Sequence, residues 1–249
     1  MDALAETLRN SGLDVDTKVI VGKSSVEIVC EVLRDKHDLV MRVAKRASSR
    51  RKGFFGTTSK RLLRECPCAV HFVASEQPTS SHVLACIDTS TGEAEDAELN
   101  ERILTLATTI ASRDKASVSI AHAWMVDGEH IHEGRIPVSE FNQMRCERKE
   151  YVTRMLNEFL EPGGFSSEDG NVFMLKGYPA NVIPKFIQTQ KVDFVVMGTV
   201  GRSGAAGRLI GNTAEEVLES IECSVMAVKP KTYISPMKLG EYIAASKQL

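Results

Sequence analysis

An internal repeat constrains the fold of this 249-residue chain more than any other feature of its sequence. The stretch Lys18–Val73 aligns without gaps to Phe173–Val228, at an offset of 155 positions. Identical or similar residues recur at this spacing, including Gly22 on Gly177, Asp38 on Asp193, Gly56 on Gly211, Thr58 on Thr213 and Cys68 on Cys223. Solenoid repeats have periods of roughly 20–50 residues. A period as long as a whole domain therefore indicates a duplicated unit.

The later copy has the alternating pattern of an α/β domain. Apolar runs typical of buried parallel strands alternate with stretches typical of helices. The expected strands are His82–Asp88, Ser117–Val126, Val172–Leu175, Asp193–Gly198 and Ser224–Val228. The expected helices are Glu93–Ser112, Val138–Leu160, Pro179–Gln190 and Thr213–Glu222. This order predicts βαβ units that form a parallel sheet with helices on both faces.

The earlier copy is incomplete. The offset places Met1 on Leu156, so nothing matches the first two strands of the later copy. Half a unit buries little apolar surface and should be only marginally stable alone, so we expect it to pack against the later copy, another chain or a missing N-terminal part. A misassigned start or a gene fragment would explain the truncation. The expected organisation is a partial, degenerate unit at 1–75, a linker at 76–81, a complete unit at 82–229 and a tail at 230–249.

Composition predicts an ordinary soluble protein. The 31 Lys and Arg residues nearly balance the 33 Asp and Glu residues, and 43% of residues are hydrophobic. No run approaches 18 consecutive apolar residues, so no membrane span or membrane partner is expected. Met1–Asn10 lacks the basic and apolar regions of a signal peptide. These observations predict a cytoplasmic protein.

The six cysteines mostly lie in apolar runs, which is typical of buried thiols in a reducing compartment. Cys66-Pro67-Cys68 is a CxC sequence, and no second pair completes a zinc site. His130-Ile131-His132 lies in a polar stretch that is more typical of a solvated loop than of a zinc site. We therefore expect no metal site, and a redox role for the CxC pair is not favoured.

A glycine-rich loop follows the fourth strand of the later copy. Gly198, Gly201, Gly204, Gly207 and Gly211 allow backbone N–H groups to approach an anion closely. A helix is expected to begin near Thr213, which forms a capping box with Glu216, and helix N-termini attract phosphate. Arg202 and Arg208 add positive charge. Local spacing alone fits a phosphate cradle and a ligand-free surface turn about equally well.

The spacing of this loop is similar to a family motif. Gly198, Gly201 and Gly211 match the G-x2-G-x9-G pattern of nucleotide-binding members of the universal stress protein family. Asn212 stands where that motif has Ser or Thr, and Thr213 follows it. The resemblance spans about His82–Lys229 and, in part, Val15–Val73, and the tail Lys231–Pro236 (KTYISP) is similar to tandem members of the family.

This resemblance implies a Rossmann-like five-stranded parallel sheet of order 3-2-1-4-5. It implies that ATP, with or without magnesium, lies across the carboxyl ends of the first and fourth strands. Asp88 would then meet the adenosine and the backbone of Ala123 would touch adenine. Met197, Gly198, Gly201 and Gly211 would shape the loop, while Arg202, Asn212 and Thr213 would face phosphate. The departure at Asn212 bears on phosphate affinity rather than on the fold.

The earlier copy lacks the cradle, because Val43 and Arg46 stand where the later copy has Gly198 and Gly201. We expect it to bind no ATP. Nine Lys or Arg residues and no acid lie between Arg42 and Arg64. Such a patch could bind RNA or another polyanion. We favour a solvated loop whose charge is balanced by the acids of Glu93–Glu101, because the net charge is −2.

Three functions are consistent with the sequence. The first is an ATP-binding regulator of the stress response that acts through conformation or assembly. The second is a nucleotide-free interaction module. The family resemblance implies that it pairs through fifth strands, either as a homodimer or within the chain between Val70–Val73 and Val225–Val228. The third, a slow ATPase, is the weakest, because no general base is placed beside the phosphates and His122 is expected to be a buried strand residue.

Overall fold

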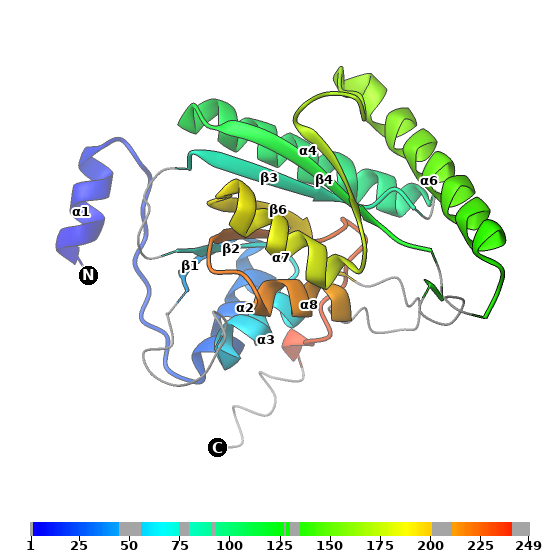
Figure 1. Cartoon of the computed structure of the whole chain (residues 1–249). Helices are drawn as coiled ribbons and strands as arrows, with labels where there is room; N and C mark the ends of the chain where they lie inside the picture. Colours follow the sequence, from blue (N-terminus) through cyan, green and yellow to red (C-terminus); the bar gives the residue numbers. More distant parts are fainter. Residues whose placement is uncertain are drawn as a thin grey trace.

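The computed structural model describes residues 2–44, 56–74, 80–90, 93–126, 128–129, 135–200 and 211–240. Its strands are β1 (Leu39–Val43), β2 (Ala69–Val73), β3 (His82–Ile87), β4 (Ser117–Trp124), β5 (Val172–Lys176), β6 (Phe194–Gly198) and β7 (Ser224–Val228). Its helices are α1 (Asp2–Asn10), α2 (Ser24–Asp35), α3 (Thr57–Glu65), α4 (Ala94–Asp114), α6 (Val138–Leu160), the short η1 (Glu161–Gly163), α7 (Pro179–Gln190) and α8 (Asn212–Glu219). The strands form one seven-stranded sheet of order β1-β2-β7-β6-β3-β4-β5 (Figure 1).

Two apolar layers enclose the part of the sheet formed by β5, β4, β3, β6 and β7, in which neighbouring strands are parallel. Successive side chains of a strand point to opposite faces, so each strand feeds both layers. In β6, Phe194 and Val196 pack with α4 and α6, whereas Val195 and Met197 pack with α7 and α8. A strand that is buried on both faces is almost continuously apolar, which explains why these strands can be recognised as apolar runs in the sequence.

The two repeated stretches have the same backbone geometry. Helices α2 and α7 are both 12 residues long and begin 155 positions apart. Strands β1 and β6, and β2 and β7, have the same separation. Lys36 and Lys191, which follow α2 and α7, are both left-handed, with φ of 55° and 53°. Gly22 and Gly177 have φ of 148° and 132°, which only glycine adopts readily.

Strands β2 and β7 join the two stretches. They pair in antiparallel fashion, with Val70 opposite Ala227 and Phe72 opposite Val225. The pairing predicted within the chain is therefore present. The predicted five-stranded sheet is not a separate sheet, since β1 and β2 extend it to seven strands. Pairing satisfies the backbone groups that β7 would otherwise expose at an edge, and it buries Phe72 completely.

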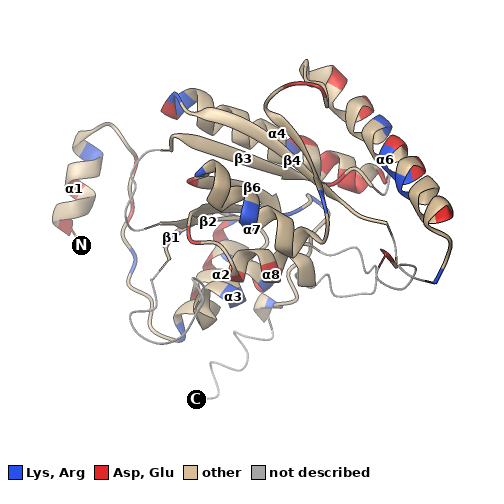
Figure 2. Cartoon of the chain, in the orientation of Figure 1, with Lys and Arg blue, Asp and Glu red and all other residues tan. Residues whose placement is uncertain are grey.

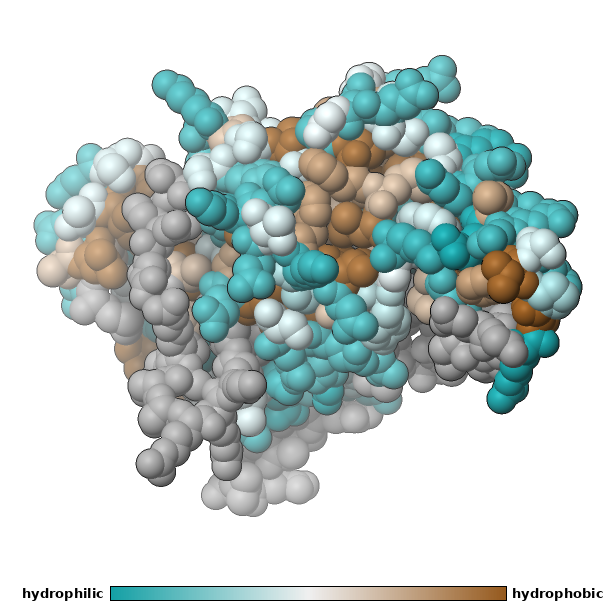
Figure 3. Space-filling view, viewed as in Figure 1, coloured by the Kyte–Doolittle hydropathy of each residue, from teal (hydrophilic) through white to brown (hydrophobic). Residues whose placement is uncertain are grey.

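One face of β1 is open. Leu39, Met41 and Val43 are 41%, 62% and 56% exposed, whereas their counterparts Phe194 and Val196 on β6 are buried against α4. No helix in the described ranges covers β1 on this face. The hydropathy view shows brown apolar patches among the hydrophilic residues of the visible face, including on α1, where Leu4 and Leu8 are exposed (Figure 3). None of the helices in the described ranges has both the length and the apolar character needed to cross a membrane.

Candidate functional site

Asp88 follows the carboxyl end of β3 and is held from α4. Asn100, 4% exposed, accepts a hydrogen bond from the Asp88 N–H at 3.0 Å and donates one to the Asp88 carbonyl at 2.7 Å. The Asp88 Oδ1 accepts from the N–H and the hydroxyl of Ser90, at 3.0 and 2.6 Å. The turn after β3 is thus fixed from both sides, and the Asp88 side chain is exposed at the sheet edge where the sequence placed it.

Strand β6 ends beside this turn. The parallel register that pairs Cys86 with Met197 brings Asp88 level with Thr199. The Gly211 N–H donates to the Thr199 carbonyl at 3.0 Å, and the Thr199 N–H donates to the Val228 carbonyl at 3.1 Å. Thr199 and Gly211, which lie at the two ends of the glycine-rich loop, are therefore adjacent to each other and next to Asp88. Gly201, Arg202 and Arg208 within it lie outside the described residues.

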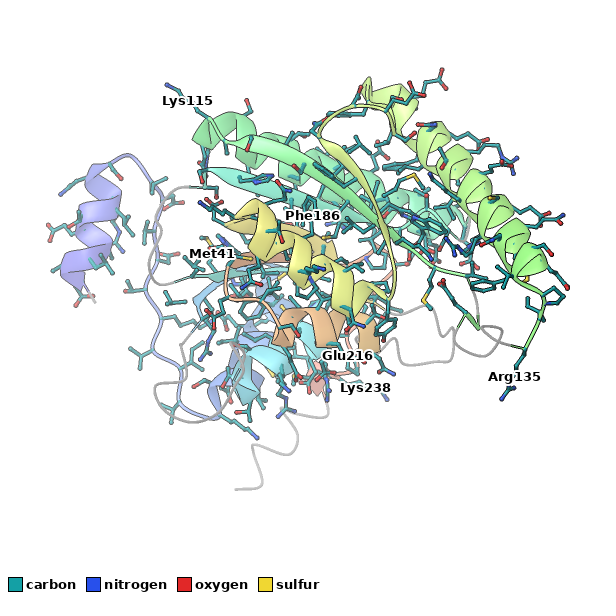
Figure 4. The ribbon with its side chains drawn as sticks, in the orientation of Figure 1. Met41, Lys115, Arg135, Phe186, Glu216 and Lys238 are labelled. Atoms are coloured by element: carbon teal, nitrogen blue, oxygen red, sulfur yellow. The ribbon has the colours of Figure 1, made fainter. Side chains whose placement is uncertain are left out.

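Helix α8 begins at Asn212, with Gly211 as its N-cap and no side-chain cap. The predicted capping box of Thr213 and Glu216 is wrong, because Thr213 lies inside the first helical turn. The Glu216 Oε1 instead accepts from the Tyr178 hydroxyl at 3.4 Å; Glu216 is labelled on α8 in Figure 4. Glycine has no side chain with which to cap the first N–H groups. Within the described ranges, the N-cap residue therefore gives the positive end of α8 no side-chain acceptor, and such a helix end is a favourable position for an anion.

Three other predicted site residues are partly or wholly structural. Met197 is 5% exposed and lies in the core with Ala214 and Val217, so only its backbone faces the strand end. A Cβ on Gly198 would meet Leu99 Cδ2 at 2.9 Å. One reason for glycine at this position is therefore that it leaves space for the Leu99 side chain of α4. Ala123 is partly buried and lies one residue before the end of β4.

Sequence reasoning missed three residues at this edge. Thr199 is completely buried and Thr89 is 6% exposed, and neither hydroxyl has a hydrogen-bond partner among the described residues. A buried hydroxyl without a partner is costly, so both are candidates to bind a ligand or the loop. The third is Asn100. A signal for it existed, since Asn100 shares the buried stripe of α4 with Ile103, Ala107 and Ala111.

His122 behaves as a buried strand residue, as the sequence predicts. It is completely buried on β4, and its Nδ1 is 3.2 Å from the Ile87 carbonyl oxygen. Burial, aided by the charge of Arg148 and opposed by the Ile87 hydrogen bond, lowers the pKa of His122 to about 4. The imidazole is therefore neutral near pH 7, with Nδ1 as the donor.

The described basic residues of α3 are paired with acids. Lys60 forms ion pairs with Glu219 and Glu215, Arg64 with Glu215 at 2.8 Å, and Arg61 with Glu65 at 2.7 Å. Figure 2 shows blue and red residues intermixed where α3 and α8 lie side by side. The expected balancing acids, Glu93–Glu101, are therefore the wrong ones for this helix; Glu215 and Glu219 of α8 pair with Lys60 and Arg64, and Glu65 of α3 itself pairs with Arg61. Residues 45–52 of the basic stretch lie outside the described residues.

Two other features lie away from the strand ends. A hollow of about 870 Å³ follows α6 and is lined by Cys146, Lys149, Thr153 and Phe165, among others. Glu31, Asp35 and His37 come together in the described part of the chain, but Lys18 already forms ion pairs with both carboxylates. His130–His132 lie outside the described residues.

Comparison with known proteins assigns the family. A family model described as the universal stress protein family matches residues 80–229, which include β3 to β7, Asp88 and the glycine-rich loop. The chain belongs to the universal stress protein family. Universal stress protein E of Escherichia coli strain K12 is 27% identical over 245 residues, covering 93% of this chain and 73% of that protein. The homologue from Haemophilus influenzae is 23% identical, covering 89% and 72%.

Solved structures show the same fold. A functionally unknown protein from Pseudomonas aeruginosa PAO1 is 25% identical, with a TM-score of 0.76 covering all of this chain and 81% of that one. A universal stress protein from Archaeoglobus fulgidus is 18% identical, with a TM-score of 0.60 covering 92% and 76%. At that identity the second match supports the α/β fold alone.

Proposed function

We propose that this universal stress protein binds an adenine nucleotide at the carboxyl ends of β3 and β6. The nucleotide acts as a regulatory ligand that stabilises one conformation or assembly. The protein works in the cytoplasm, a reducing compartment that is consistent with its six free cysteines.

One structural relationship carries this proposal. Asp88, whose backbone is hydrogen-bonded to Asn100, lies level with Thr199. The Thr199 carbonyl in turn accepts a hydrogen bond from Gly211, the N-cap residue of α8. An exposed carboxylate that can accept ribose hydroxyls and a helix start that attracts phosphate therefore share one sheet edge. Ligands of open α/β sheets bind at this edge, where the strand order reverses. The order β7-β6-β3-β4-β5 reverses between β3 and β6.

The proposed roles follow the position of each residue. Asp88 accepts hydrogen bonds from the nucleoside, and the backbone of Ala123 lies against the base. Gly201 and Gly211 let the loop approach the phosphates, and the N–H groups of Asn212 and Thr213 donate to them. Arg202 adds charge. The buried hydroxyls of Thr89 and Thr199 are two further donors at the same edge.

Regulation is favoured over catalysis by the neutral, buried state of His122. The charged group that acts on it in the described part of the chain is Arg148, and a cation lowers the basicity of an imidazole instead of raising it. Strand β7 connects the proposed site to the earlier repeated stretch, because it pairs with β6 on one side and with β2 on the other. A change at the nucleotide site can therefore reach the earlier stretch through β7. We propose that residues 1–75 are a partial, degenerate copy of the complete unit at 82–229, connected by 76–81 and followed by a tail at 230–249.

Thermal unfolding tests the proposal. A ligand that binds only the folded state stabilises it by about 2.7 kcal/mol at a hundred times its dissociation constant. Millimolar ATP should therefore raise the Tm of the full chain by several degrees, and sodium sulfate at matched ionic strength should not. Equal shifts from both would indicate a general anion effect and would contradict a nucleotide site.

A second candidate is a nucleotide-free interaction module, which the residue at 212 favours. Asn212 stands at the first helical position, where nucleotide-binding members of the family have Ser or Thr. Replacing it with Ser separates the two candidates. Under the first proposal, Asn212→Ser strengthens binding that already exists in the wild type. Under the second, ATP leaves the Tm of the wild type unchanged.

A further inference from the structure

The C-terminal end of α3 is held by the segment that follows β7. Three successive carbonyls, of Arg64, Glu65 and Cys66, accept hydrogen bonds from the side chains of Tyr233, Ser235 and Lys229. The last carbonyls of a helix lack partners within the helix and carry its negative end, so a cation is favourable there. This segment therefore brings an ammonium group to the start of the Cys66-Pro67-Cys68 turn.

Lys229 is an unusual cation, because it is only 3% exposed. Its Nζ lies 4.1 Å from the ring centroid of Tyr233, and its own carbonyl accepts from Arg102 of α4 at 2.6 Å. Burial lowers the pKa of Lys229 to about 8, while Cys66, Cys68 and Glu65 act to raise it. The ammonium group is thus kept charged near pH 7 in an apolar setting, beside two thiols.

The two thiols of the CxC turn face each other. Cys66 Sγ lies 3.4 Å from Cys68 Sγ. Cys66 is completely buried, whereas Cys68 is partly exposed. The hydrogen bond from Cys68, with the nearby Lys229 charge, lowers the pKa of Cys66, and the same interaction raises the pKa of Cys68. The turn therefore pairs an accessible sulfur with a buried one that ionises more easily.

We propose that Cys66 and Cys68 form a redox-active dithiol that small-molecule disulfides oxidise to an intramolecular disulfide, with Lys229 as its positioning residue. The site is independent of the nucleotide site, since the CxC turn lies between α3 and β2.

The reaction takes two thiol–disulfide exchanges. The Cys68 thiol first passes its proton across the shared hydrogen bond to the Cys66 thiolate, and the exposed Cys68 thiolate then attacks the small disulfide RS–SR. A Cys68–SR bond forms, the S–S bond breaks, and the leaving RS⁻ takes that proton back from Cys66 and departs as RSH. The Cys66 thiolate then attacks the Cys68 sulfur, which forms the Cys66–Cys68 bond and releases the second RSH. The protein loses two hydrogens and two electrons, and the small disulfide gains them.

The surroundings favour this pair over the other cysteines. Burial raises the pKa of both Cys86 and Cys223 to about 12, and burial also raises the pKa of Cys30, whose Sγ lies 3.5 Å from Met237 Sδ. Cys146 is exposed on α6, far along the chain from any second thiol. It can form a mixed disulfide but is not placed to resolve one.

The test uses oxidised glutathione on the reduced, folded full chain, followed by alkylation and peptide mapping by mass spectrometry. We expect the Cys66–Cys68 peptide to become about 2 Da lighter and resistant to alkylation, and reduction to reverse both changes. Cys68→Ser should abolish this product, and Cys146→Ser should leave it unchanged. If Cys66 and Cys68 remain alkylatable while Cys146 carries glutathione, the dithiol proposal is overturned.

Lys229→Gln tests the positioning role, because the amide keeps a donor for the Cys66 carbonyl and removes the charge. The other titratable groups facing the pair are Glu65 of α3 and Tyr233, and both are retained. A pKa higher by one unit lowers the thiolate fraction tenfold but raises its nucleophilicity about threefold, so the rate near pH 7 should fall about threefold. The pH of half-maximal rate should also move upward.

Ser235→Ala is the matched control for Lys229→Gln, since it removes the neighbouring hydrogen bond to the Glu65 carbonyl and no charge. It should leave the pH profile of oxidation in place. An unchanged profile in Lys229→Gln, or an equal displacement in Ser235→Ala, would remove Lys229 from the proposal.

Discussion

Asn100 binds both backbone polar groups of Asp88, accepting from its N–H and donating to its carbonyl. The contact joins the middle of the buried stripe of α4 to the turn at the end of β3. Because both bonds go to the backbone, Asn100 fixes where the Asp88 carboxylate points without touching it. It is thus a structural support for the proposed nucleotide site.

Asn100→Leu should weaken both stability and nucleotide binding. The leucine has a similar volume but leaves the N–H and the carbonyl of Asp88 without their side-chain partner, which costs about 1–3 kcal/mol. Urea unfolding measures the stability and calorimetry measures the affinity for ATP. Asn171→Leu is the matched control, since Asn171 donates to the Val118 carbonyl at the opposite sheet edge. The Asn171→Leu variant should lose stability without losing affinity for ATP. An equal loss of ATP affinity in both variants would contradict the role of Asn100.

Much of this fold could be predicted because buried parallel strands are apolar without interruption. The strands expected at 224–228 and 193–198 match β7 and β6 within one residue. The 155-residue offset identified Val70–Val73 and Val225–Val228 as equivalent strands, and their pairing within the chain was one of the two arrangements that the family resemblance implied. The helix start was harder to predict. The Thr213 and Glu216 spacing satisfies the capping-box pattern, but Gly211 takes the N-cap position because its carbonyl already accepts from Glu215.

Contacts between residues that are distant in the sequence could not be predicted from it. Nothing local links Lys229 to Cys66, or Lys60 to Glu219, because those pairs depend on how β2 meets β7. The basic stretch therefore looked unbalanced, although α8 supplies acidic partners for Lys60 and Arg64. Thr199 was missed for the same reason, since nothing in the sequence shows that its buried hydroxyl has no partner among the described residues. The apolar stripe of α4 indicated that Asn100 is buried, but not that Asp88 is its partner.

Gly198→Ala should force the Leu99 side chain of α4 to move and should lower stability. The added Cβ would lie 2.9 Å from Leu99 Cδ2, and overpacking of this kind costs about 1–3 kcal/mol. Chemical denaturation should show the loss. The double variant with Leu99→Ala tests the cause, because the smaller side chain makes room for the new methyl group. Non-additive recovery of stability is expected, and simple addition of two losses would show that the glycine is needed for another reason.

Phe72→Ala should weaken the join between the two stretches. Phe72 is completely buried at the β2–β7 pairing, and removing such a ring costs about 3–5 kcal/mol. The urea midpoint should fall for the whole chain, because both core layers share the sheet. Met41→Ala on the open face of β1 should change stability by no more than about 0.5 kcal/mol. A local transition in Phe72→Ala that spares β3 to β6 would contradict a shared core.

Stability should depend on pH through His122. Its pKa of about 4 in the folded protein lies below the 6.5 of an ordinary histidine, so the unfolded chain binds more protons between these values. Stability should therefore fall as pH drops from 6.5 to 4, by at most about 1.4 kcal/mol per pH unit from this group. His122→Gln should reduce that slope. Some slope should remain, because burial also lowers the pKa of His71. An unchanged slope would contradict a lowered pKa of His122 in the folded protein.

Calorimetric titration of the full chain with ATP, beside Gly201→Val and Gly170→Val, tests the central claim most directly. Gly170 precedes β5 at the opposite sheet edge, and a Cβ there would meet nothing within 4 Å. We expect micromolar binding by the wild type and by Gly170→Val, and its loss in Gly201→Val, because a branched side chain blocks close approach of the loop backbone to phosphate. Equal affinity in all three proteins, or a folded wild type that binds no ATP, would contradict the nucleotide site.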